Sequence, residues 1–318
     1  MRIENSIFFL MFLSVAPNLF SNVSEHGDKT QENKVKAQVT TEYEYVNGNP
    51  TNSGIKSRVT RFDSFGNKIE EINYKPSGEV HSVLIYKYDE KGNKVAYSKY
   101  GGNKEKLEYS QSFTYDKDGK KLSEEGFNGA ENFKTGFIYN NGKLSEINYL
   151  IDNKVDEKRV FTYSGNVVEI NVLNAKGQLQ YVLKNTNNNK GKVLLEEKTE
   201  NGFVTRSVSY EYDAKGNLIK EEKYLNGKFA NRISRVYNTN NTLMEIYQEN
   251  NGFDKFITHQ YKYDKNGVLT AELYRNTADK DFSKDIYKYN EKGINVSIDS
   301  FYASYNQQVL YVFNYEFY

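Results

Sequence analysis

The sequence contains no cysteine and no tryptophan, and only 3 of its 318 residues are proline. The lack of cysteine excludes disulfide bonds, thiolate metal sites, cysteine nucleophiles and a lipid-modified N-terminal cysteine. Neither sign of charge is in excess, since 43 Lys and Arg stand against 42 Asp and Glu. The chain as a whole therefore has no strong electrostatic field that would attract nucleic acid, and we expect no nucleic-acid partner.

Aromatic residues are abundant instead: the chain has 28 Tyr and 19 Phe, and aromatics make up 15% of the composition. Tyrosine fits the pleated, half-buried surface of a β-sheet better than it fits a helix. The length alone is compatible with one large domain or two ordinary ones.

The N-terminus is typical of a secretory signal peptide, which we place at residues 1–21. Arg2 precedes the short apolar run 7–13, and polar sequence follows from Asn18. The run is too short for a membrane-spanning helix, and a buried N-terminal strand or helix is the alternative. Residues 22–40 are polar and predict a flexible leader, followed by a single domain over 41–318. The expected location is secreted, periplasmic or at a bacterial cell surface.

An aromatic residue followed by Asp or Asn, with a nearby Gly, recurs along the chain. The clear copies are Phe62-Asp63, Tyr88-Asp89, Tyr115-Asp116, Tyr139-Asn140, Tyr212-Asp213, Tyr237-Asn238, Tyr263-Asp264 and Tyr289-Asn290, with Tyr315-Glu316 at the end and degenerate copies at Tyr163-Ser164 and Asn187-Asn188. Successive copies lie 24 to 27 residues apart, and eleven of them cover residues 57–318. Such a period indicates a repeat architecture.

Strand-length runs separate these marks, for example "RSVSYEY" and "NLIKEEKY". Each repeat thus predicts two antiparallel strands. The fold class is all-β: a repetitive hairpin meander of about eleven 24–27-residue repeats. Because open twisted sheets rarely exceed about ten strands, we expect about 22 strands to curl or twist into an elongated sheet, a shell or a solenoid.

Asp213, in "YDAKGN", raises the question of chemistry against architecture. Its carboxylate can accept hydrogen bonds from nearby backbone amides while Gly216 supplies a positive φ, as in a type I turn with a bulge. Asn replaces Asp in other copies, which a turn tolerates and a general base does not. The best calcium candidate, Asp116 with Asp118, lacks the remaining ligands of an EF-hand loop. We therefore predict no metal site and no cofactor.

Alternation places Val208, Tyr210 and Tyr212 on one face of a strand, which is the candidate core face. Ile219 and Tyr224 are separated by an odd number of residues, so the second strand of the repeat has a bulge or is covered on both sides. Glutamates recur in that second strand, and basic residues recur across the hairpin, which predicts cross-strand ion pairs on a solvated face. The glutamates are Glu70, Glu71, Glu124, Glu125, Glu196, Glu197, Glu221 and Glu222, and the basic residues are Lys87, Arg206, Arg232 and Arg235.

Catalytic motifs are missing from the sequence. His26, His81 and His259 lie far apart, and no phosphate loop, nucleophile elbow or histidine pair with metal spacing is present. We predict that the protein is not an enzyme, and no catalytic, cofactor-binding, metal-binding or ligand-binding residue is assigned.

The repeated words "YDEKGNKV" at Tyr88 and "YDAKGNLI" at Tyr212 resemble those of the YD-repeat (RHS-type) family of secreted bacterial proteins. The resemblance implies a β-rich repeat scaffold, in some members a shell around a toxin domain and in others a carbohydrate or cell-surface binder. The repeat is longer than is usual in that family, and the chain has no Asp-Pro pair and no toxin-sized tail, so a stand-alone repeat protein fits better. The Tyr and "NGK" hairpins are also similar to MORN-repeat variants.

An outer-membrane β-barrel is a further alternative, since Tyr311, Phe313, Tyr315 and Phe317 alternate near the C-terminus. Runs such as "LIKEEKY" carry charge on both faces, which a lipid-facing band does not tolerate. We therefore expect no integral membrane insertion, and a terminal strand that is paired and closes the array.

The function predicted from these patterns is a secreted or cell-surface, non-enzymatic scaffold for adhesion or ligand binding, with a glycan or a surface protein as partner. The alternatives are a purely structural envelope component, an outer-membrane β-barrel or a carbohydrate-active enzyme. A contiguous strip of exposed tyrosines in a groove favours a binding protein, and scattered tyrosines favour a scaffold.

Overall fold

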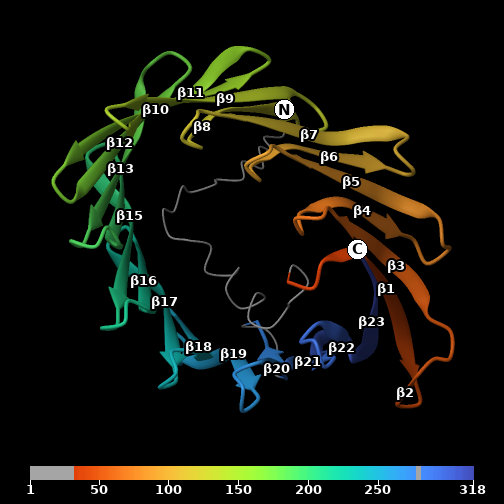
Figure 1. The fold of residues 1–318 in the computed structure, drawn as a ribbon. Coiled ribbons are helices and arrows are strands. Elements are labelled where there is room, and N and C mark those ends of the chain that lie inside the picture. Colours follow the sequence, from red (N-terminus) through yellow and green to blue (C-terminus); the bar gives the residue numbers. More distant parts are fainter. Residues whose placement is uncertain (1–31, 277–280) are drawn as a thin grey trace, which may run out of the picture.

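The computed structural model describes residues 32–276 and 281–318, and these residues form one antiparallel sheet of 23 strands (Figure 1). The first twelve strands are β1 (Val35–Val46), β2 (Asn49–Pro50), β3 (Ile55–Phe62), β4 (Lys68–Tyr74), β5 (Val80–Tyr88), β6 (Lys94–Gly101), β7 (Lys106–Tyr115), β8 (Lys121–Phe127), β9 (Asn132–Asn140), β10 (Lys143–Ile151), β11 (Lys154–Ser164) and β12 (Val167–Asn174). The others are β13 (Leu179–Asn187), β14 (Val193–Glu200), β15 (Phe203–Tyr212), β16 (Leu218–Leu225), β17 (Lys228–Tyr237), β18 (Leu243–Asn250), β19 (Phe256–Tyr263), β20 (Leu269–Tyr274), β21 (Ser283–Tyr289), β22 (Asn295–Tyr302) and β23 (Gln307–Phe317). A 3-10 turn, Ala303–Tyr305, precedes β23.

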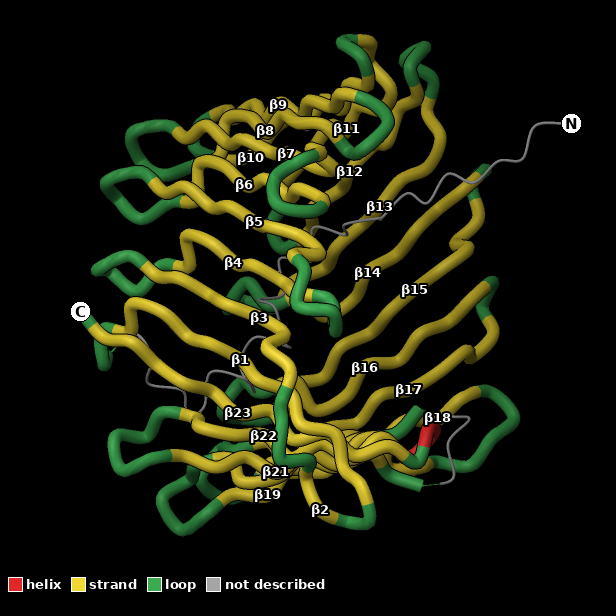
Figure 2. Tube along the Cα trace, turned by 90° about the vertical axis from the view of Figure 1, so that its right-hand side faces the viewer, coloured by secondary structure: helices red, strands yellow, loops and turns green. Residues whose placement is uncertain are grey.

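The sheet closes on itself. From β3 onward each strand pairs with the next, and β1 pairs with β3 on one side and with β23 on the other. The short strand β2 pairs with β1 alone, which leaves 22 of the 23 strands in the ring. Figure 1 views the ring along its axis, and Figure 2 shows the strands lying side by side in its wall. The molecule is a 22-stranded antiparallel β-barrel.

This closure overturns the predicted fold class. The sequence indicated an open or elongated sheet, a shell or a solenoid, but the terminal strand finds its partner at the other end of the chain, where Gln38 aligns with Tyr315. The paired terminal strand itself is confirmed. Closure removes both sheet edges, whose unpaired N–H and C=O groups would otherwise be left to water or to another chain.

The expectation of no integral membrane insertion is overturned by the same finding. A closed barrel satisfies all of its ladder hydrogen bonds internally, which is the condition that a bilayer imposes on β-structure. Within residues 32–276 and 281–318, no helix has the length and apolar character to cross a membrane.

The circumference gives the width of the barrel. At about 4.8 Å per strand, 22 strands make a ring of about 17 Å radius before strand tilt widens it. Side chains of opposite walls cannot meet across such a ring, so each part of the wall packs only against its neighbours in the sheet.

Two faces of the wall follow from strand alternation. The face that carries Phe113, Ile147, Val172 and Val208 contains most of the buried side chains, and Ile147 and Val172 are 0% exposed. Side chains converge on the concave side of a curved sheet, so we assign this face to the inner wall. The prediction that Val208, Tyr210 and Tyr212 share the core face is consistent with Val208, which is 2% exposed.

The Asp turns form as predicted. The Asp213 N–H donates to the Asn217 carbonyl and the Gly216 N–H to the Asp213 carbonyl, both at 2.9 Å. The Asp213 carboxylate accepts the Asn217 backbone N–H and the Asn217 side-chain amide, both at 2.8 Å. Gly216 has φ +88°, a conformation that glycine adopts without strain. Asp213 is therefore an architectural residue.

In eight of the repeats the tyrosine beside the turn links two neighbouring strands. Its hydroxyl donates a hydrogen bond to a backbone carbonyl at the start of the preceding strand, at distances between 2.6 and 3.3 Å. The pairs are Tyr88 to Lys68, Tyr115 to Lys94, Tyr139 to Lys121, Tyr163 to Leu144, Tyr212 to Val193, Tyr237 to Leu218, Tyr263 to Leu243 and Tyr315 to Asn295. The repeated sequence motif thus forms a turn and, through its tyrosine, a hydrogen bond to the preceding strand. We call this hydrogen bond the hydroxyl strap.

The domain boundary needs one correction. Strand β1 begins at Val35, within the segment 22–40 that the sequence assigned to a flexible leader. The remainder of that segment up to residue 31, and the predicted signal peptide at 1–21, lie outside the described residues.

Candidate functional site: the inner wall of the barrel

The residues that the sequence singled out for chemistry do not come together. His26 lies outside the described residues, His81 is exposed on β5, and His259 is half-buried on β19 between the rings of Tyr261 and Tyr274. The Asp116 carboxylate caps its own turn by accepting the Asp118 and Lys120 amides at 2.9 Å. In the described part of the chain, no three His, Asp or Glu side chains are grouped so as to hold a metal ion.

The recurrent glutamates divide between the two faces, which corrects the prediction of a single solvated face. Glu70 pairs with Arg61 and with Lys104 on the outer wall. Its neighbour Glu71 points the other way and pairs with Lys68 at 3.0 Å. Consecutive strand residues must face opposite sides, so each Glu-Glu pair supplies one carboxylate to each wall.

The outer wall carries further ion pairs. Arg232 on β17 lies between Glu222 on β16 and Glu249 on β18, at 2.6 and 2.7 Å. Lys158 on β11 pairs with Glu146 on β10 at 2.6 Å. These pairs link adjacent strands in the way predicted for a cross-strand ladder.

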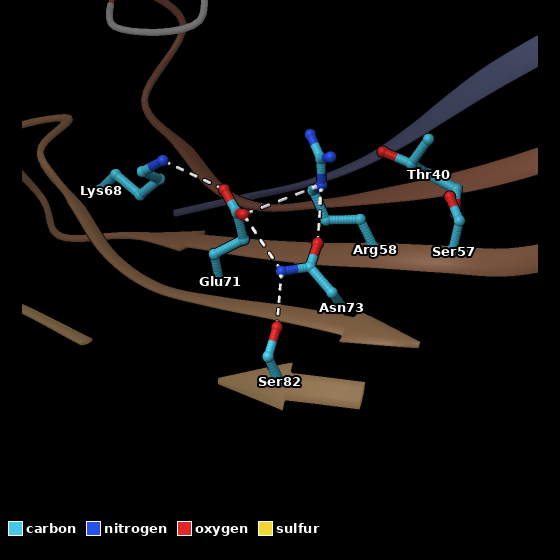
Figure 3. A network of polar contacts seen from close by, with 7 residues as sticks. All are labelled: Thr40, Ser57, Arg58, Lys68, Glu71, Asn73 and Ser82. Carbon is cyan, nitrogen blue, oxygen red and sulfur yellow. Dashed lines mark hydrogen bonds and ion pairs between the residues drawn. The ribbon is translucent and has the colours of Figure 1, made fainter. Parts of the chain in front are cut away.

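On the inner wall, polar groups of β3, β4 and β5 form a connected network (Figure 3). The Arg58 Nε donates to Asn73 Oδ1 at 3.1 Å, and the Asn73 amide donates to Glu71 and to Ser82, both at 3.3 Å. Lys68 completes the network through Glu71. The network holds two cations, Arg58 and Lys68, around the single carboxylate of Glu71, so it keeps one net positive charge.

A hollow of about 560 Å³ lies against the inner wall between β11 and β16. Apolar side chains form much of its lining, namely Phe161, Ile170, Leu183, Val208 and Leu225. At the edge of the hollow, Lys198 Nζ lies 4.2 Å from the centroid of the Tyr181 ring. The Tyr210 hydroxyl donates a hydrogen bond to the Glu196 carboxylate at 2.9 Å.

A second hollow, of about 620 Å³, lies against a row of aromatic rings. Tyr86 on β5, Tyr97 on β6, Tyr109 on β7 and Phe133 on β9 follow one another, with ring centroids 5.1, 5.6 and 6.1 Å apart. We call these four residues the aromatic row. Its tyrosines line the hollow together with Lys94, Lys99, Glu108, Gln111 and Asn128.

Gly126 explains how the row crosses β8. It is aligned with Phe133 of β9 and with Gln111 of β7, which lies two residues from Tyr109 on the same face. A Cβ at this position would collide with the Ser110 carbonyl. A residue without a side chain therefore allows Tyr109 and Phe133 to meet across the intervening strand.

Sequence reasoning missed the aromatic row. The tyrosine that lies two residues before Tyr88 is on the same face of the strand, which was the available signal. That Tyr97 and Tyr109 lie beside it depends on the bulges between β5 and β6 and between β6 and β7, whose positions the sequence does not mark.

No protein-family model matches the chain, and no curated protein is similar to it in sequence. Among solved structures, it is similar to a toxin complex, TcdB2-TccC3 without its hypervariable C-terminal region, with 14% identity over 81% of this chain and a TM-score of 0.37. It is also similar to a porin-like protein from Bacteroides uniformis, with 10% identity over 89% of this chain and 98% of that one, at a TM-score of 0.31. The chain spans only 14% of the toxin complex chain. At TM-scores this low, the matches support no conclusion about this chain.

The classification as a YD-type hairpin-repeat protein is corrected by these results. The hairpins are successive strands of one barrel that closes on itself, and no family model supports membership in the YD-repeat family.

Proposed function

We propose that the chain is a β-barrel protein of the bacterial outer membrane or cell surface, that it binds a solute on its inner wall, and that it catalyses no reaction. The observation that carries this proposal is the closure of the sheet through β1 and β23 around a wall whose inner face bears two hollows. The secretory character of the N-terminus, inferred from the sequence, supports a location outside the cytoplasm.

The closed barrel favours solute binding over adhesion, because closure of the sheet replaces an extended outer surface with an enclosed inner wall. Closed barrels with wide interiors hold ligands or pass solutes through their lumen. Both the membrane-embedded and the surface-attached arrangement keep the inner wall accessible to solutes outside the cell.

The location is tested by fractionating bacteria that express the full chain and by extracting their envelopes with alkaline carbonate. A membrane-embedded barrel stays in the pellet, and a surface-attached barrel is released from the envelope. Recovery of the full-length chain in the cytoplasmic fraction contradicts the proposal in both forms.

Solute binding is tested with two adjacent reporters, since the chain contains no native cysteine. Gln111 faces the inner hollow, whereas Ser110 belongs to the opposite face of the same strand. A fluorophore on the Gln111→Cys variant should respond to solutes that enter the barrel, and the same fluorophore on the Ser110→Cys variant should not. Equal responses of the two variants, or no response to any class of solute, contradict lumenal binding.

A further inference from the structure

The rings of the aromatic row are not core residues. Tyr86, Tyr97 and Tyr109 are all of intermediate exposure, whereas the buried core residue Ile147 is 0% exposed. Their remaining surface faces the hollow of about 620 Å³ that they line. A tyrosine ring that is packed on one side and open on the other offers a flat apolar platform beside a polar hydroxyl.

The polar groups around the platform are suited to hydrogen bonding and carry a single net positive charge, that of Lys94, which lies over the Phe113 ring at 5.6 Å. Lys99 and Glu108 pair across β6 and β7 at 2.9 Å, which neutralises both. Gln111 Oε1 accepts the Tyr109 hydroxyl at 3.2 Å, and the Gln111 amide nitrogen has no other partner among the described residues. Asn128 uses its Oδ1 for the Ala130 and Glu131 amides, which leaves its amide nitrogen as a second donor at the hollow.

The row is also extended. Its members come from β5 to β9, and the successive centroid distances of 5.1, 5.6 and 6.1 Å make the row up to about 17 Å long. A ligand that covers all four rings is therefore a chain of several units, and each unit has an apolar face for stacking and polar groups at its edge.

We infer that the aromatic row is the binding site for a neutral oligosaccharide, which deepens the proposed function and rests on it. A sugar ring stacks the C–H bonds of one face on an aromatic ring while its equatorial hydroxyls bond to amides and carboxylates. A single-stranded nucleic acid would stack as well, but it needs a row of uncompensated cations along its phosphates, and of the two lysines that line the hollow Lys99 is paired with Glu108, which leaves Lys94 alone. A lipid chain would need a lining that is mainly apolar, and Gln111, Asn128, Glu108 and Lys99 exclude that.

In the test, the full-length barrel is titrated with maltohexaose and with cellohexaose. Binding is measured by isothermal titration calorimetry and by saturation-transfer NMR. Tyr97 contacts rings on both sides, so the Tyr97→Ala variant should weaken binding at least tenfold. The Tyr97→Phe variant keeps the platform and should bind within about threefold of the parent. Tyr224, which makes a ring contact with Phe229 outside the row, provides the matched control, and Tyr224→Ala should leave affinity unchanged.

Circular dichroism checks that each variant keeps its β-structure. If Tyr97→Ala fails to fold, the milder variant Gln111→Ala takes its place, and it should also weaken binding. The inference is overturned if neither oligosaccharide binds, or if Tyr224→Ala and Tyr97→Ala lose affinity equally. If the fluorophore at Gln111→Cys responds to another class of solute while both oligosaccharides fail to bind, the carbohydrate inference falls and the proposed function stands. If no solute of any class reaches that reporter, both fall.

Discussion

The hydroxyl of Tyr88 donates a hydrogen bond of 3.0 Å to the backbone carbonyl of Lys68 on the neighbouring strand. This contact recurs with other tyrosines around the barrel, so it belongs to the way the wall is built. Replacing Tyr88 by Phe removes the bond and leaves the ring in place. We expect the free energy of unfolding to fall by about 0.5–1.5 kcal/mol, the usual net contribution of one hydrogen bond, in urea denaturation.

Tyr100 on β6 is the control for that prediction, because its hydroxyl makes no hydrogen bond with any described residue. Tyr100→Phe should leave the unfolding midpoint within experimental error. An equal loss in the two variants would show that the hydroxyl strap does not stabilise the wall.

Gly126 tests the crowding between β7 and β9. Gly126→Ala places a methyl group against the Ser110 carbonyl, so the strand must shift. We expect a loss of at least about 2 kcal/mol in unfolding free energy, since overpacking and strain cost about 1–3 kcal/mol each. Gly136 on β9 faces open space, and Gly136→Ala should be neutral or slightly stabilising. Thermal melts of both variants measure the contrast, and a neutral Gly126→Ala variant would contradict this packing.

The turn aspartates predict a dependence on pH. Hydrogen bonds from the Asn217 side chain and backbone lower the pKa of Asp213 below its ordinary value near 3.8, and Asn93 does the same to the pKa of Asp89. A lowered folded-state pKa stabilises the fold above the unfolded-state pKa, and this stabilisation is lost as the pH falls through the folded-state value.

An Asp213→Asn variant makes that dependence measurable. The difference in unfolding free energy between the parent and the variant should be constant above about pH 5 and should shrink as the pH falls below 3.8. NMR titration of the Asp213 carboxyl gives the folded-state pKa directly. A pKa at or above the ordinary value would refute the turn assignment.

Arg232 tests the surroundings of the outer wall. Its guanidinium bridges Glu222 and Glu249, and the three side chains are 34%, 14% and 29% exposed. In water, Arg232→Gln should lower the unfolding free energy by about 1 kcal/mol, and 1 M NaCl should reduce that effect by screening. An effect that is several times larger and independent of salt would place this part of the wall in a low-dielectric environment such as lipid.

The local structure was largely predictable from the sequence, because it is set by residues close to each other in the chain. Asp213 and Gly216 specify a turn, and alternation places Val208 and Tyr212 on the same face. Closure was not predictable in this way. It depends on the accumulated twist of all strands and on the match between β1 and β23, whose partners Gln38 and Tyr315 lie 277 residues apart.

The candidate site was not predictable for a related reason. The aromatic row needs Tyr97 opposite Tyr86 and Tyr109 one diagonal step away on β7, and bulges between these strands set the alignment. A shift of one residue in either pairing would turn the rings to opposite faces. Charged residues on both strand faces argued against a barrel in the sequence. In the structure Glu70 lies on the outer wall and Glu71 on the inner wall, and both form ion pairs.

The central claim is that the ring closes through β1 and β23. Thr41 and Val312 are aligned partners across that seam, and the chain has no cysteine of its own. In the double variant Thr41→Cys/Val312→Cys, mild oxidation should form a disulfide within one chain, seen as a faster-migrating monomer that dithiothreitol reverses. Val160→Cys/Val312→Cys, whose positions lie in strands that do not pair, should remain unlinked. Disulfide-linked dimers alone, or no link in the seam variant, would show that the sheet is open.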